Sequence, residues 1–129
     1  MTIEQIIDSI NKEWNSSSMV SLTAEVEGVL DLRLQGISPT LGDLVNNTNH
    51  ILSQLISQRE NNLNPIICCV YAAVGLRVLS LYFRTERVLG FPNMGNSVGT
   101  LPWSNQLTKK DVLKMFLDSM EEDFNIKIF

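Results

Sequence analysis

The sequence predicts a mainly α-helical fold, a compact bundle of four or five helices around a buried central helix at residues 64–89. Three observations support this prediction. Residues 66–76 carry no polar side chain except Tyr71, and a helix that is apolar nearly all round is buried by other elements or by lipid. Three further segments have apolar side chains on one helical face only. The length of 129 residues suits a single globular domain, 1–129.

The first predicted helix covers residues 2–14. Thr2 and Gln5 have the spacing of a capping box, in which two side chains satisfy free backbone N–H groups. Apolar side chains recur at helical spacing and share one face. They are Ile3, Ile6, Ile7, Ile10 and Trp14. This one-sided face needs a packing partner, which a soluble bundle would supply.

Residues 19–35 fit two interpretations. Apolar residues occupy the even positions from Val20 to Leu34, and such alternation is typical of a strand. A helix would instead place Gly28 in its interior, at a cost of about 1 kcal/mol. We favour the helix, because the rest of the chain is helical and would leave a sheet with few strands. The C-terminal residues 124–129 also alternate, so a minor β element built from these two segments, in an α+β fold, is the alternative.

Residues 40–60 form the clearest predicted helix, which begins after Pro39. Its apolar stripe consists of Leu41, Leu44, Val45, Thr48, Ile51, Leu52, Leu55 and Ile56. The last predicted helix covers residues 109–123, with Thr108 as its N-cap. Its buried face consists of Val112, Leu113, Met115, Phe116, Leu117 and Met120. The short link before residue 64 indicates that the helix at 40–60 and the central helix are antiparallel neighbours.

The central helix has clear end signals. Asn64 is a good N-cap, Pro65 fits the first helical position, and Gly90 suits a left-handed residue after the helix. Residues 66–83 are long enough to span a membrane. However, Arg77 within them would cost about 2.5–3.5 kcal/mol in lipid, and the other one-sided helices need a partner. We therefore expect a core helix of a soluble protein and no membrane span.

Composition and charge argue against several function classes. The net charge is −4, and an acidic chain without a basic block argues against nucleic-acid binding. The start of the chain carries Glu4 and Asp8 and no positive region, so it does not resemble a signal peptide. The adjacent Cys68 and Cys69 make no disulfide framework and indicate a reducing compartment. We therefore expect a cytoplasmic protein.

The sequence offers few residues for catalysis or metal binding. One histidine and two neighbouring cysteines are too few ligands for a zinc site. His50 lies on the polar face of its helix, so we expect it on the surface, away from any Cys–His nucleophile pair. Gly95 and Gly99 lack the lysine and the preceding strand of a phosphate loop. We expect no enzymatic activity, no metal and no cofactor.

Three arginines form the main electrostatic feature of the central helix. Arg77, Arg84 and Arg87 share one edge and are candidates for binding an anion. The structural alternative is that they pair with acids of the N-terminal half such as Glu25, Glu27 or Asp31, because a nearly buried arginine must be paired.

The long segment 88–108 carries no charged side chain between its ends and is rich in Gly, Pro and Asn, which rules out a long regular element. We expect an ordered loop at 90–106, and loops of this length within compact domains are often functional. The structural alternative is a loop that Phe91 and Trp103 merely hold against the bundle.

The most economical hypothesis is a non-enzymatic protein-binding domain, a small acidic inhibitor or immunity-type protein that neutralises another, basic protein. The alternatives are a structural subunit that forms a homo-oligomer, through a stripe of small residues on the central helix, and a binder of a small anionic ligand. The candidate partner-binding residues are Phe91, Asn93, Met94, Asn96 and Trp103 of the loop, with Glu4, Asp8, Glu25 and Glu27.

Overall fold

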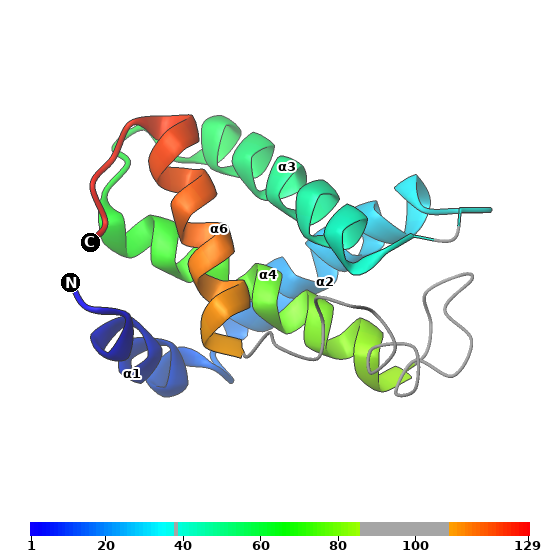
Figure 1. Cartoon of the computed structure of the whole chain (residues 1–129), viewed down its shortest axis with the longest axis horizontal. Coiled ribbons are helices and arrows are strands. Elements are labelled where there is room, and N and C mark those ends of the chain that lie inside the picture. The colour runs from blue at the N-terminus through cyan, green and yellow to red at the C-terminus, as the bar shows by residue number, and fades with distance from the viewer. Residues whose placement is uncertain (38, 86–108) are drawn as a thin grey trace.

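A computed structural model describes residues 1–37, 39–85 and 109–129. Within these ranges the chain forms helices and no strand, which confirms the predicted mainly α bundle (Figure 1). The helices are α1 (Ile3–Glu13), α2 (Ser17–Arg33), α3 (Leu41–Arg59), α4 (Pro65–Thr85) and α6 (Lys109–Phe124).

The central helix α4 is the element on which the other described helices pack. α2 and α6 have the most extensive contacts with it, and α3 and α1 follow. In Figure 1, α4 runs between α3 on one side and α1 on the other. Residues Pro65–Tyr82 are long and apolar enough to cross a membrane, with a mean hydropathy of 1.8, yet 61% of this stretch is buried within the bundle. That burial is typical of a core helix.

Side-chain caps define the starts of α1, α2, α3 and α4, and that of α2 is Ser16, which accepts from the N–H of Met19 at 3.3 Å. The capping box of Thr2 and Gln5 begins α1 as predicted. A second capping box, formed by Thr40 and Asp43, begins α3, and the sequence analysis had missed it. Asn64 caps α4 by accepting a hydrogen bond from a first-turn N–H at 3.0 Å. The predicted end of this helix near residue 89 and Gly90 lies outside the described residues.

Residues 19–33 of the ambiguous segment are helical, so the strand interpretation was wrong. The buried residues of α2 follow helical spacing: Met19, Thr23, Val26 and Leu30. The alternation of apolar residues does not mark one buried face, because Val20 is 46% exposed and Leu32 is 68% exposed. Gly28 is tolerated in the helix because it faces open space, where an added Cβ would meet nothing within 4 Å.

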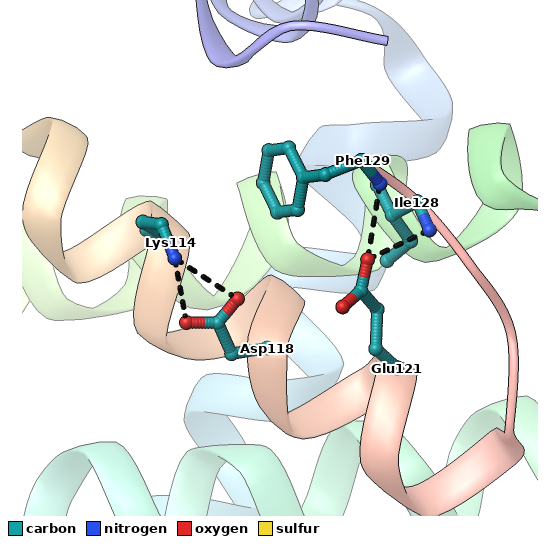
Figure 2. A network of polar contacts seen from close by, with 5 residues as sticks. All are labelled: Lys114, Asp118, Glu121, Ile128 and Phe129. Atoms are coloured by element: carbon teal, nitrogen blue, oxygen red, sulfur yellow. Dashed lines mark hydrogen bonds and ion pairs between the residues drawn. The ribbon is translucent and has the colours of Figure 1, made fainter.

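The C-terminal residues also form no strand, because Glu121 binds their backbone N–H groups after α6 ends (Figure 2). Asn125 turns the chain with a φ of 54°. One side-chain oxygen of Glu121 then accepts hydrogen bonds from the N–H groups of Ile128 at 2.7 Å and Phe129 at 3.0 Å. These backbone donors therefore need no partner strand. The N-terminal ammonium of Met1 donates to the carbonyl of Ile128 at 3.3 Å, which brings the two chain ends together.

Small residues on α4 allow close helix packing, as their spacing predicts. A Cβ built on Gly75 would lie 2.9 Å from Cζ of Phe116 and 3.0 Å from Cδ1 of Leu52. Cys68 and Ala72 of the same stripe are also fully buried. The stripe therefore faces this chain's own core. On α6 one expected core residue was wrong, because Met115 is 40% exposed.

Candidate functional site

The acidic residues predicted to meet a partner lie on two separate helices. On α1, Glu4 is paired with Lys110 of α6 at 2.5 Å, and the hydrogen bond from this lysine lowers the pKa of Glu4. Asp8 is exposed on the same helix. On α2, Glu25 faces α3 and is paired with Arg59 at 2.5 Å. The acids therefore make no single cluster, and two of them already hold a cation.

Two further residues of the predicted sets are half-buried. Glu27 of α2 is one of them and has an interaction of its own. Arg77 is the other: it donates a hydrogen bond to the backbone carbonyl of Trp14. Its guanidinium carbon also lies 5.3 Å from the centroid of the Trp14 ring, a cation–π contact. The pairing of Arg77 with Glu25 or Asp31, which the sequence suggested, is therefore replaced by a contact with α1.

The remaining predicted site residues belong to the loop and to the C-terminal part of the arginine edge. The loop residues Phe91, Asn93, Met94, Asn96 and Trp103 lie outside the described residues. Arg87 lies outside them as well, and of Arg84 only the helical backbone is described. The arginine edge and the loop therefore stay predictions.

The structure instead draws attention to a groove between α1 and α4, which we call the α1–α4 groove. It encloses about 310 Å³. Its apolar lining consists of Met1, Ile10, Met19, Ile66, Cys69, Val70 and Ala73. Ser9, Lys12 and Glu13 supply its polar edge. Ile66 is 65% exposed and Met1 is 46% exposed, so apolar surface continues from the groove onto the outside of the molecule.

A second cavity lies on the other side of α1, toward α6, and we call it the Trp14 pocket. It encloses about 280 Å³. Four residues form its apolar part: Ile7, Ile10, Leu76 and Leu113. The other four lining residues are Asn11, Trp14, Asn15 and Lys110. Because Ile10 lines both cavities, α1 is the wall between them.

The cysteines of α4 are buried and poorly suited to nucleophilic chemistry. Burial raises the pKa of Cys69 to about 11, and it raises the pKa of Cys68 as well. A thiol with such a pKa is protonated at neutral pH, and the thiolate is the reactive form. Cys69 therefore serves the α1–α4 groove as an apolar wall.

His50 is exposed on α3, as predicted, and lines an open hollow with Ser53 and Asp123. These three residue types occur together in hydrolases, but their arrangement here differs. The hydroxyl of Ser53 donates to Asp123 at 3.0 Å, whereas a nucleophilic serine donates to the histidine. Among the described residues no group of three or more His, Cys, Asp or Glu could hold a metal ion.

The sequence analysis missed both cavities beside α1. The apolar residues of their linings recur at helical spacing, so the pattern identified them as core. The only signal in the sequence was the run of small residues on α4, including Ala73, which leaves space unless a large side chain opposes it. No known protein family, curated protein or solved structure matches this chain.

Proposed function

We propose that this protein is a non-enzymatic protein-binding domain that docks an apolar segment of its partner in the α1–α4 groove. The observation that carries the proposal is Ile66, which is 65% exposed at a groove of about 310 Å³ with a largely apolar lining. Exposed apolar surface that continues into a concave site is typical of interaction sites. The buried core of such an interface is apolar and its rim polar, as Ser9, Lys12 and Glu13 would provide here.

The partner segment that fits this site best is an amphipathic helix with basic residues beside its apolar side chains. The groove lies between two helices, and a third helix can lay its apolar face into such a groove. α1 carries three acids, Glu4, Asp8 and Glu13, against one base, Lys12. This excess of negative charge would attract a basic partner and accelerate its association.

The role that we propose for such a domain is that of a small acidic inhibitor or immunity-type protein, which blocks its partner by occupying it. The net charge of −4 supports this role. A homo-oligomer built on the small-residue stripe of α4 has less support, because Gly75 already contacts Phe116 and Leu52 within the chain.

The proposal is tested by changing the exposed rim of the groove. The tagged protein captures partners from its host's lysate at low salt, and mass spectrometry identifies a stoichiometric one. Ile66→Glu should then weaken binding of that purified partner by tenfold or more, about 1.4 kcal/mol. The change should not disturb folding, since the side chain is mostly in solvent.

Leu32→Glu is the matched control, because Leu32 is equally exposed at 68% on α2 and does not line the groove. It should bind the partner as the unchanged protein does. Glu13→Gln should slow association at low salt and leave dissociation unchanged. A partner that binds the Ile66→Glu and Leu32→Glu variants equally well would refute docking in the groove.

A further inference from the structure

The cavity on the other side of α1 has a different chemistry from the groove. It combines an apolar floor with the polar side chains of Asn11, Asn15 and Lys110. Leu113 is 1% exposed, Ile10 is 7% exposed and Leu76 is 8% exposed, so the floor is part of the core. A largely apolar cavity with a few placed polar groups is the usual form of a small-molecule site.

We propose that the Trp14 pocket binds a small amphipathic carboxylate, with the apolar body on Ile7, Leu76 and Leu113 and the carboxylate at Lys110. This is a separate site from the groove and does not depend on a protein partner. Its volume of about 280 Å³ lies just below the usual range of roughly 300–1,000 Å³ for ligand pockets. The ligand is therefore an aryl or medium-chain alkyl acid and not a nucleotide.

The aromatic wall of the pocket is held in place before any ligand binds. Arg77 donates a hydrogen bond to the carbonyl of Trp14, and its guanidinium lies over the indole ring at 5.3 Å from the centroid. Both contacts come from α4, so they fix the end of α1 and the orientation of its tryptophan. A wall that is fixed in advance lowers the entropy cost of binding. The contact with Trp14 also engages Arg77, so among the described residues Lys110 is the cation that lines the cavity.

The polar lining residues of the pocket have donor hydrogens available. The side-chain amides of Asn11 and Asn15 have no hydrogen-bond partner among the described residues. The ammonium of Lys110 is bonded to Glu4 at 2.5 Å, and an ammonium has three donor hydrogens. A ligand carboxylate can therefore join or replace Glu4 at the lysine. One cation suits a monoanion, whereas a polyphosphate needs several.

The test is a titration of the full chain with octanoate and with 3-phenylpropionate, followed by NMR of the Trp14 indole and the Asn11 and Asn15 amides. The matched neutral amides and inorganic phosphate are titrated in parallel. Both carboxylates should shift these signals saturably, and each acid should bind about tenfold more tightly than its amide, which corresponds to one charge-assisted hydrogen bond. Phosphate, which has no apolar body, should not saturate.

Lys110→Met should lower the affinity for the carboxylates by about tenfold and leave that for the amides unchanged. Lys110→Gln should do the same, and it keeps a polar side chain if the methionine disturbs α6. The control is Lys114→Met, one turn along α6, because Lys114 is paired with Asp118 at 3.0 Å and does not line the pocket. The absence of saturable binding at millimolar carboxylate, or equal binding by the Lys110 and Lys114 variants, would overturn the proposal.

Discussion

The two sides of α4 are filled to very different degrees. Toward α3 and α6, Gly75 lies so close to Phe116 and Leu52 that even a Cβ would come within 3.0 Å of both side chains. Toward α1, the groove and the Trp14 pocket leave about 310 Å³ and about 280 Å³ unfilled. A helix that is apolar nearly all round can therefore build a closed core on one side and open cavities on the other.

This difference separates the stabilising part of the molecule from its candidate binding part. Close packing is where volume changes are felt most, and a cavity is where an added group finds room. Both proposed sites lie against α1, the shortest of the described helices at 11 residues. The packed side of α4 is the scaffold that would hold them.

The largest expected effect comes from adding volume on the packed side. Gly75→Leu should lower the free energy of unfolding by about 3 kcal/mol, because overpacking a filled core forces side chains off their rotamers. Phe116 and Leu52 are both 0% exposed, so neither side chain can move aside into solvent. Chemical denaturation followed by circular dichroism measures the change.

Gly28→Leu is the control for this prediction, because it makes the same substitution inside a helix where a Cβ meets nothing. It should raise stability by up to about 1 kcal/mol, since leucine is the better helix former. If both variants lose stability equally, the close packing around Gly75 is not what determines the cost of the substitution.

The next effect concerns the polar contact between α4 and α2. Tyr82 is 2% exposed and its hydroxyl donates to Asp31. Tyr82→Phe removes that donor from a half-buried carboxylate and should cost about 1–2 kcal/mol. Denaturant titration at neutral pH measures it. A cost below that of an exposed substitution such as Leu32→Ala would contradict the assigned contact.

The raised pKa values of Tyr82 and Cys69 predict how stability falls at alkaline pH. Burial, and then the bond to Asp31, raises the pKa of Tyr82 above its usual value, and the pKa of Cys69 is raised to about 11. The folded state therefore keeps protons that the unfolded state loses above about pH 8.5 for cysteine and about pH 10 for tyrosine. Stability should be complete below pH 8.5 and fall as the pH rises through 11. Tyr82→Phe should make the fall above pH 10 shallower.

A smaller effect is expected on the open side. Val70→Leu should change the free energy of unfolding by less than about 1 kcal/mol, because the half-buried Val70 lines the α1–α4 groove and the added methylene has space there. It should also weaken the binding of the proposed protein partner, because it fills the site. A loss as large as that of Gly75→Leu would remove the contrast between the two sides of α4.

The smallest effect tests whether every buried polar group on the packed side of α4 has a hydrogen-bond partner. Thr48 is 0% exposed and its hydroxyl has no hydrogen-bond partner among the described residues. Thr48→Val keeps the shape and removes a buried polar atom, so it should raise stability by about 0.5 kcal/mol. Thermal unfolding detects the shift, and a loss of stability would show that the hydroxyl is bonded in solution.

Helical periodicity predicted most of the scaffold. The apolar faces of α1 and α3 are one-sided and capped, so local residues determine them. For α2 the local pattern was ambiguous, because its exposed Val20 and Leu32 are as apolar as its buried residues. Only packing against α3 and α4 selects the face, and that choice involves residues distant in the sequence.

The candidate sites were not predictable in the same way. Lys110 and Glu4 lie 106 residues apart, and Arg77 lies 63 residues from Trp14. No local spacing indicates such pairs. A cavity is also a shortage of volume between helices, which depends on how far apart they settle. The small side chain of Ala73 permits the gap, but nothing near it in the sequence determines whether another helix fills it.

The contact between Met1 and Ile128 means that the polypeptide nearly closes into a ring. A short peptide could join Phe129 to Met1, and the ring could be reopened at residues 60–64, between α3 and α4. The helix that organises the bundle would then be the first to leave the ribosome, and the others would be added to it in turn.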